Sequence, residues 1–434
     1  MSTQGLPGKA WQRIAASRGA AGAVSAQVTQ AAGSLALQAL AAHLLGLSGL
    51  GRFALLYGSL IVITALTSGF VGDSLTVLDR SHPVVRSALQ VWAGGIVAGA
   101  SILAAIVTTL LGLTTPLEGL VFGLAAAAYT SEDLIRRLLM AEFTFWRICI
   151  VDLVAAASAI TVVAVGAAAI SLTTLLAAVA IGQAAGLIVG IVLLPRRQRW
   201  LAPLHRGALG HVASFGAWRA AQQAIRPSLL TALRYTVILA AGYAAAGGIE
   251  AARIYVAPTM LVIGGVSSYL FADYSRRTST PLAKLVRRAD RSVLILAGLT
   301  VAAGLVAVAA LPVAGPLLVG HTIGLIAVIG WLAYSATVAA VTPYGSLASV
   351  RGSQRWVFAA RLGDSLLSLV TVLVLFALSG SAVFAPALLA IGSLAGGIVI
   401  RFAILSPSRQ SRITAPAILL YPPSEGAVPR VHTS

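Results

Sequence analysis

A stripe of arginines lies on one face of a long apolar segment of the sequence. The segment is His211–Tyr243, and its polar residues are Arg219, Arg226 and Arg234, with Gln222 and Gln223 beside them. Steps of seven and eight residues keep the three arginines within about 80° of one another around a helix. Guanidinium groups bind phosphate oxygens through paired hydrogen bonds, so the stripe is a candidate anion-binding surface. Arg219 and Arg234 could instead extend to the membrane interfaces, whereas Arg226 lies at mid-span just before a proline.

A second polar stripe lies near the N-terminus. Its residues are Gln27, Gln30, Ser34 and Gln38. Their spacing also keeps them within about 80° of one helical face. Amide side chains can bind hydroxyl-rich groups or can join two membrane helices by hydrogen bonds, and the sequence leaves both roles open. If this stripe and the arginines face one cavity, that cavity suits phosphate and sugar rather than a cationic drug.

A few further ionisable residues are candidates for ion coupling or for structural ion pairs. They are Asp73, Asp152, Asp364 and Arg361. Arg361 is three residues from Asp364, and Arg147 is five from Asp152, which favours ion pairs; coupling to H+ or Na+ remains the alternative. The pairs Glu132/Arg136 and Asp133/Arg137 are typical of a solvated helix end. The histidines lack ligand spacing and Cys149 is the only cysteine, so we expect no metal and no other cofactor.

These residues belong to a chain of unusual composition. Of its 434 residues 58% are hydrophobic and only 10% are charged. Soluble domains have roughly 25% charged residues, so this is a membrane protein. At about 20 residues per crossing, the apolar segments predict about twelve transmembrane helices. The predicted spans are Gly19–Leu45, Gly51–Leu78, Ser87–Leu111, Leu117–Leu139, Ile148–Ile170, Leu172–Leu194, His211–Tyr243, Gly248–Tyr274, Ser292–Leu311, Leu317–Val341, Trp356–Leu378 and Ala382–Ile404.

The net charge of +18 follows from topology. Most Lys and Arg residues fall in alternate connections, and the positive-inside rule then places both termini in the cytoplasm. No nucleic-acid partner is needed to explain the charge. The predicted organisation is a cytoplasmic leader (1–18), a six-helix bundle (19–195), a cytoplasmic linker (196–210), a second six-helix bundle (211–404) and a disordered cytoplasmic tail (405–434).

An internal repeat relates the two halves. The sequence AIGQAAGLIV at Ala180–Val189 recurs as AIGSLAGGIV at Ala390–Val399. Asp152 and Asp364 precede the two copies at a similar distance. Two repeats of six spans share one orientation, and a cavity between two such bundles is the usual arrangement in transporters. The fold class is therefore an all-α polytopic membrane protein with a central cavity.

Two loops resemble those of a known family. GLSGLGRFALLYGSL at Gly46–Leu60 and GGIEAARIYVAP at Gly247–Pro258 look like matching loops in bacterial polysaccharide flippases of the multidrug/oligosaccharidyl-lipid/polysaccharide exporter (MOP) superfamily. The resemblance implies alternating access between two bundles and transport of an undecaprenyl-diphosphate-linked glycan. It also implies a multi-pass location in the bacterial plasma (inner) membrane, with Arg226 and Arg234 opposite the glutamines of the first span.

The expected function is thus flipping or export of a lipid-linked, anionic oligosaccharide or polysaccharide precursor. Membrane lipids surround the protein, and a polysaccharide polymerase or glycosyltransferases are the expected protein partners. The short loops between spans and the lack of catalytic motifs argue against an enzyme. A proton-coupled exporter of small molecules or drugs, of the major facilitator or multidrug extrusion type, is the alternative. A non-transporting scaffold would instead have a closed, apolar centre.

Overall fold

The computed structural model describes residues 6–78, 82–142, 144–199, 203, 207–277, 279–379 and 381–406. These residues form helices and connections, with no strand among them. The α-helices are α1 (Leu6–Thr67), α2 (Asp73–Val77), α3 (Pro83–Leu110), α4 (Pro116–Ala141), α5 (Phe145–Val165), α6 (Leu172–Leu193), α7 (Arg196–Arg199), α8 (Leu209–Arg276), α9 (Leu282–Val319), α10 (Leu325–Arg351), α11 (Gln354–Ser379) and α12 (Ala385–Val399). Short π-helices follow α1 at Ser68–Gly72 and α12 at Ile400–Ile404, and a 3₁₀ turn at Ala167–Ala169 follows α5.

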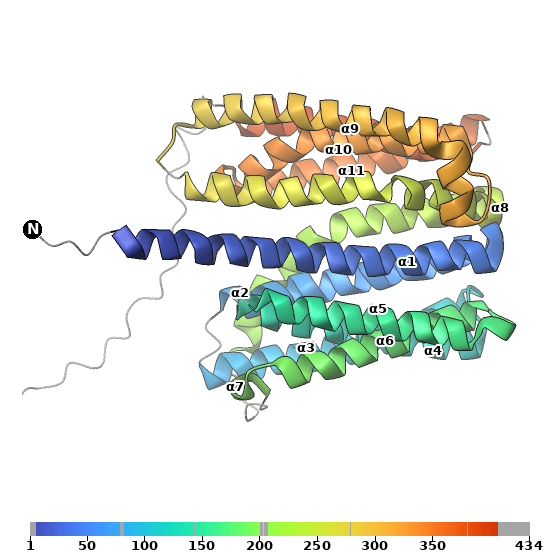
Figure 1. The fold of residues 1–434 in the computed structure, drawn as a ribbon, viewed down its shortest axis with the longest axis horizontal. Helices are drawn as coiled ribbons and strands as arrows, with labels where there is room; N and C mark the ends of the chain where they lie inside the picture. The colour runs from blue at the N-terminus through green and yellow to red at the C-terminus, as the bar shows by residue number, and fades with distance from the viewer. Residues whose placement is uncertain are drawn as a thin grey trace, which may run out of the picture.

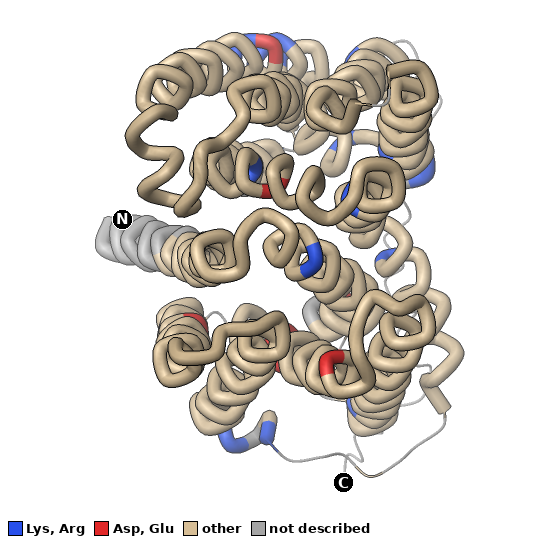
Figure 2. The backbone as a smooth tube through the Cα atoms, turned by 90° about the vertical axis from the view of Figure 1, so that its right-hand side faces the viewer, with Lys and Arg blue, Asp and Glu red and all other residues tan. Residues whose placement is uncertain are grey.

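Two groups of helices lie on either side of α1 and α8. Figure 1 shows α3–α6 on one side and α9–α11 on the other, with the chain N-terminus at the left end of α1. The view along the helices shows the same two groups (Figure 2). We call α1–α6 the N-bundle and α8–α12 the C-bundle. Within the described part of the chain, α1 and α8 make the most extensive contact between the bundles.

α1 and α8 each contain a sharp kink at a glycine. Gly46 has φ of 65° and Gly242 has φ of 82°, in the left-handed region that glycine adopts without strain. Each kink reverses the chain, so that α1 contains the first two predicted spans and α8 contains the seventh and eighth. We call the end of the molecule that carries both kinks the kink end, and the other the opposite end.

The two kinks touch each other through reciprocal glycine contacts. A Cβ atom on Gly51 would collide with the Tyr243 carbonyl oxygen, and one on Gly247 would collide with the Leu47 carbonyl oxygen. Each kink thus presents a glycine to the backbone of the other. Only glycine allows backbones to approach so closely, which explains these residues in the two loops.

The repeated sequence packs in the same way in both halves. Gly182 of α6 lies against the backbone of Ala155 in α5, and Gly392 of α12 lies against the backbone of Asp364 in α11. Small residues at such contacts let membrane helices pack closely. The repeat seen in the sequence therefore corresponds to equivalent helix pairs, α5–α6 and α11–α12.

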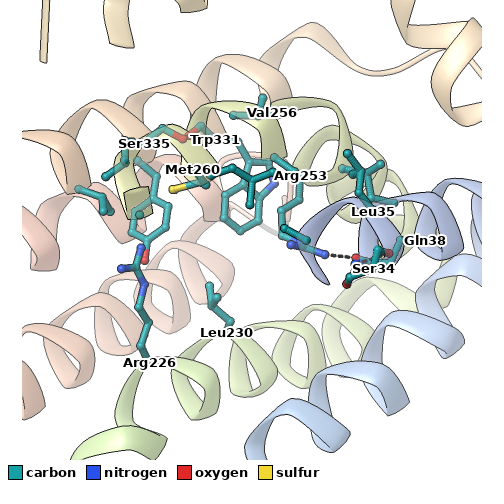
Figure 3. Close-up of a pocket in the computed structure, with 18 of the residues that line it drawn as sticks. Ser34, Leu35, Gln38, Arg226, Leu230, Arg253, Val256, Met260, Trp331 and Ser335 are labelled. Atoms are coloured by element: carbon teal, nitrogen blue, oxygen red, sulfur yellow. Dashed lines mark hydrogen bonds between the residues drawn. The ribbon is translucent and has the colours of Figure 1, made fainter. Parts of the chain in front are cut away.

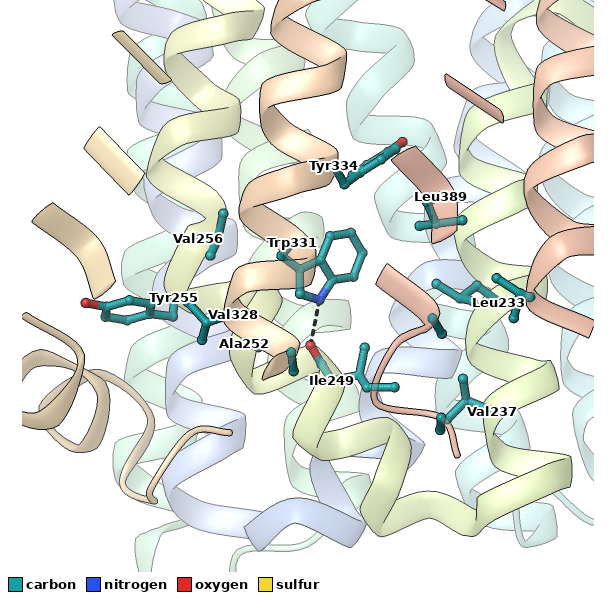
Figure 4. Packing of buried hydrophobic residues seen from close by; sticks show 14 of the residues in the cluster. Leu233, Val237, Ile249, Ala252, Tyr255, Val256, Val328, Trp331, Tyr334 and Leu389 are labelled. Carbon is teal, nitrogen blue, oxygen red and sulfur yellow. Dashed lines mark hydrogen bonds between the residues drawn. The ribbon is translucent and has the colours of Figure 1, made fainter. Parts of the chain in front are cut away.

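The core of the C-bundle forms where α8, α10 and α12 meet (Figure 4). Trp331 is 3% exposed and donates its indole N–H to the Ile249 carbonyl oxygen at 2.9 Å. Tyr255 donates to the Ala307 carbonyl oxygen at 2.7 Å, which joins α8 to α9. Large aromatic side chains are stable in an apolar core when their polar atoms find such partners. This packing holds α10, with Tyr334, in place beside the cavities described below.

The multi-pass membrane fold is confirmed. Nine helical segments of the described chain are long and apolar enough to cross a membrane, and two of them, in α1 and α8, contain a kink. Several helix boundaries differ from the sequence prediction. α1 begins at Leu6, so much of the predicted leader is helical.

α9 differs from the prediction by extending through Pro312 and Pro316 to Val319, where Gly320 with φ of 77° ends it. Residues 317–319, which we placed in the tenth span, therefore belong to α9. Proline is tolerated inside membrane helices because neighbouring groups satisfy the freed carbonyls. All five predicted segments lie partly outside the described residues: residues 1–5 of the leader, 79–81 and 143 of the first bundle, 200–202 and 204–206 of the linker, 278 and 380 of the second bundle, and 407–434 of the tail.

Candidate functional site

Two adjoining cavities open beside α8 and α10. The interbundle cavity has a volume of 410 Å³ and is lined from α1 by Ser34, Leu35 and Gln38 and from α8 and α10 by residues that include Arg253, Met260 and Trp331 (Figure 3). The C-bundle cavity has a volume of 520 Å³ and is lined by α8, α10, α11 and α12 alone. Both volumes are in the range of about 300–1,000 Å³ that is usual for ligand sites. Arg226 and Tyr334 line both cavities and so lie at their junction.

Arg226 is a cation without a carboxylate partner among the described residues. Its guanidinium carbon lies 5.7 Å from the centre of the Tyr334 ring, a cation–π contact. Figure 3 shows its side chain extending into the pocket on the side that carries Ser335. An unpaired cation within a membrane helix is costly, which makes Arg226 a candidate functional residue. The structure therefore places Arg226 at the cavities, as the sequence suggested, and Gln222 beside it on the wall of the C-bundle cavity.

Arg234 is held in an ion-pair network at the kink end. Its Nε and Nη2 atoms donate to both oxygens of Glu250 at 3.1 and 3.2 Å, and Glu250 is 3% exposed. Arg253 donates to the same carboxylate and to Gln38 of α1. Arg234 lines neither of the two cavities. Gln38 is thus joined to the C-bundle and also lies at the edge of the interbundle cavity.

Sequence reasoning missed Glu250 and Arg253. The signal was available, since Glu250 is the one acidic residue of the predicted span Gly248–Tyr274 that lies near its start. It lies sixteen residues from Arg234, beyond the kink at Gly242, so helical spacing cannot bring the two together. Only the reversal of the chain at the kink does so.

Arg219 and Gln223 contact the N-bundle at the opposite end. Arg219 pairs with Asp73 at 3.1 Å, and the same carboxylate pairs with Arg137 of α4 at 3.2 Å. Gln223 donates to Asp73 at 3.5 Å. Asp73 is therefore part of an ion-pair network that joins α8 to the N-bundle, and Arg219 lines neither of the two cavities.

Only some residues of the predicted glutamine stripe line a cavity. Gln38 donates to Ser34, and both line the interbundle cavity. Gln27 is exposed and Gln30 is half-buried, and neither lines either cavity. Of the predicted stripe, only the part nearest the kink end meets Arg226 at one cavity.

A buried charge cluster corrects two expectations. Arg136 is 2% exposed and Glu132 is 3% exposed, so the solvated helix end that we expected there is wrong. Arg136 pairs with Asp152 of α5 at 2.8 Å, which makes Asp152 an ion-pair residue with a different partner from the one expected. Arg147 instead donates to the Leu193 carbonyl oxygen at 2.7 Å.

Asp364 and Arg361 both line the C-bundle cavity. No ion pair joins them in the part of the chain that the structure describes, although their spacing suggested one. Asp364 accepts a hydrogen bond from the Ser365 hydroxyl at 3.0 Å. The Arg361 guanidinium lies against α10, where a Cβ atom on Gly345 would come within 2.8 Å of its Nη2 atom.

The two-bundle arrangement is similar to the folds of several solved transporter structures. The MurJ lipid II flippase in an inward closed conformation aligns with a TM-score of 0.66 at 12% identity, over 86% of this chain and 85% of that chain. An inward-facing multidrug resistance MATE transporter of the MOP superfamily aligns with a TM-score of 0.56 at 14% identity, over 88% and 92%. A eukaryotic MATE transporter gives a TM-score of 0.58 at 13% identity, over 89% and 95%.

These similar structures are transporters and flippases rather than enzymes. At such low identity the similarity describes the fold. No protein-family model and no curated protein sequence matches the chain.

Proposed function

We propose that this protein flips or exports a lipid-linked, anionic glycan precursor, of the undecaprenyl-diphosphate type, across the bacterial inner membrane. The observation that carries the proposal is the unpaired Arg226 at the junction of two cavities. Arg226 would neutralise phosphate while the acyl chain stays in lipid. The MurJ-like fold supports this substrate class because MurJ is a lipid II flippase.

The transport cycle would alternate access to the cavities. We propose that the chain crosses the membrane twelve times, with both termini in the cytoplasm. In this count α1 and α8 each cross twice, and α4 is one of the membrane-spanning helices. The end that carries Asp73 is then cytoplasmic and the kink end faces outward. The two bundles would rock about the α1–α8 contact, and the Asp73 and Glu250 networks lie at the two ends of that contact. A polysaccharide polymerase or glycosyltransferases would be partners in the same membrane.

Multidrug extrusion is the second candidate, since the fold is shared with MATE transporters. Its form here would be export of small molecules driven by H+ or Na+. The cavity residues favour the glycan, because unpaired arginines repel cationic drugs and attract phosphate.

Reconstitution distinguishes the two functions. Purified protein in proteoliposomes would be given a fluorescent undecaprenyl-diphosphate oligosaccharide or a cationic dye. We expect the protein to move the lipid-linked glycan between leaflets without accumulating the dye. Dye transport driven by an ion gradient, with no movement of the glycan lipid, would contradict the proposal and favour the drug exporter.

A further inference from the structure

The C-bundle cavity lies inside one bundle and carries more positive than negative charge. Arg226 from α8 and Arg361 from α11 line it, and Asp364 is the one carboxylate on its wall. The two guanidiniums and one carboxylate leave a net charge of about +1 in a cavity at membrane depth. Such a charge needs a compensating anion to be stable there.

Neither guanidinium forms an ion pair with the protein among the described residues, and the single carboxylate of Asp364 offsets only one of the two charges. In the described part of the chain, no ion pair includes Arg226 or Arg361, and Asp364 is hydrogen-bonded to Ser365. The Arg226 guanidinium lies over Tyr334, and that of Arg361 lies against the Gly345 backbone. Both therefore extend from different helices toward one space, with their hydrogen-bond donors available to a ligand.

The rest of the wall is rich in hydroxyl groups. They include those of Ser267, Ser346, Ser365, Ser368 and Ser393. Several of them donate to backbone or side-chain oxygens of the protein: Ser346 to the Ser267 carbonyl, and Ser368 to the Leu389 carbonyl. A serine hydroxyl is both donor and acceptor, so the wall can bind phosphate oxygens or sugar hydroxyls. The interbundle cavity, with Leu35, Met260 and Trp331, has a more apolar wall.

We infer that the C-bundle cavity is a phosphate-binding subsite in which Arg226 and Arg361 clamp the diphosphate of the carrier lipid. Arg361 thereby becomes a substrate-binding residue, in addition to Arg226. The inference rests on the proposed function for the identity of the ligand as a lipid-linked diphosphate. The binding of the phosphate group itself is a property of the cavity and can be measured without transport.

The test is binding of inorganic pyrophosphate to the full chain in phosphatidylcholine nanodiscs, followed by calorimetry. Arg361→Gln should weaken binding by at least about tenfold, because it removes charge-assisted hydrogen bonds. Arg361→Lys should keep the charge but lose the paired hydrogen-bond geometry, so its affinity for pyrophosphate should lie between those of the parent protein and Arg361→Gln. Arg355→Gln is the matched control, since Arg355 is an exposed arginine of α11 that does not line the cavity. It should leave binding unchanged.

Asp364→Asn tests the same cavity through an expected gain in pyrophosphate affinity, which misfolding of a variant could not produce. Neutralising the carboxylate raises the net positive charge of the cavity, so pyrophosphate should bind several-fold more tightly. A merely structural role for Asp364 would weaken binding instead, and that result would overturn the inference. Unchanged pyrophosphate binding by Arg361→Gln would overturn it as well.

Two competition experiments distinguish the diphosphate of the carrier lipid from the phosphate of bulk membrane lipid as the ligand. Undecaprenyl diphosphate should compete with pyrophosphate, whereas phosphatidylglycerol added to the nanodisc should not. Competition by phosphatidylglycerol would mean that bulk lipid phosphate occupies the cavity, and would refute the assignment to the carrier lipid. If pyrophosphate binds as described but the protein moves no glycan lipid, the proposed function fails and the phosphate subsite remains.

Discussion

Removing the Glu250 carboxylate should strongly destabilise the protein. Glu250 is 3% exposed and accepts hydrogen bonds from Arg234 at 3.1 and 3.2 Å, and also from Arg253. In Glu250→Gln these two guanidiniums would lose their anion while remaining largely buried. Breaking a buried ion pair by removing one partner costs about 3–5 kcal/mol, and this carboxylate serves two cations.

The assay is reversible unfolding in mixed micelles, with a double-mutant cycle. Glu250→Gln should lower the free energy of unfolding by about 3 kcal/mol or more. Adding Arg234→Met should recover part of the loss, because it removes one uncompensated charge. Arg355→Gln, at an exposed arginine of α11, is the control and should cost about 1 kcal/mol or less. The network does not stabilise the fold as argued if Glu250→Gln costs no more than this control. The same conclusion follows if Arg234→Met lowers the free energy of unfolding as much in the Glu250→Gln background as it does alone.

Three more predictions concern the core and the two ends of the α1–α8 contact. Arg136→Met should destabilise the protein by about 3–5 kcal/mol, measured by the same unfolding assay, because Glu132 and Asp152 would remain buried without their cation; a change below about 1 kcal/mol would contradict the buried cluster. Gly247→Ala should force the kinks apart, seen as faster alkylation of a cysteine introduced at Leu47 in a Cys149→Ala background; an unchanged rate would argue against the close contact. Asp73→Asn should break the contacts with Arg137 and Arg219, and should speed alkylation of a cysteine introduced at Ala220, which lies buried against Gly69; an alkylation rate equal to that of the parent would show that the Asp73 ion pairs do not hold the two bundles together at that end.

The sequence predicted the fold class well because hydropathy reports directly on membrane helices. Apolar length and the absence of strand patterning were sufficient to predict a helical, multi-pass protein. The internal repeat was also visible, since Gly182 and Gly392 are needed for close packing in both halves. The predicted ninth span ended at Leu311, whereas α9 continues through Pro312 and Pro316 to Val319, because prolines are tolerated inside membrane helices.

The candidate site was only partly predictable. Helical spacing placed Arg219, Arg226 and Arg234 on one face, but it does not determine the partner that each position meets. Arg219 meets Asp73 and Arg234 meets Glu250, both through contacts between segments distant along the chain. Among the described residues Arg226 forms no ion pair, although Asp364 lines the same cavity, and its guanidinium therefore remains available to a ligand.

The spacing of residues along the sequence also could not predict which charged pairs are buried. The pairs of Glu132 with Arg136 and Asp133 with Arg137 have the spacing of exposed helix pairs. The packing of α5 and α6 on α4 buries the first pair and adds Asp152 to it. A local pattern cannot distinguish these cases, because the same i, i+4 spacing serves both.

Transport by Arg226 variants tests the central claim most directly. In proteoliposomes, Arg226→Ala should lose most translocation of a fluorescent undecaprenyl-diphosphate oligosaccharide, and Arg226→Lys should retain part of it because the charge remains. Arg355→Gln, which alters an arginine away from the cavities, should transport like the parent protein. Full translocation by Arg226→Ala, at equal folded protein in the vesicles, would contradict the account that this arginine binds the anionic substrate.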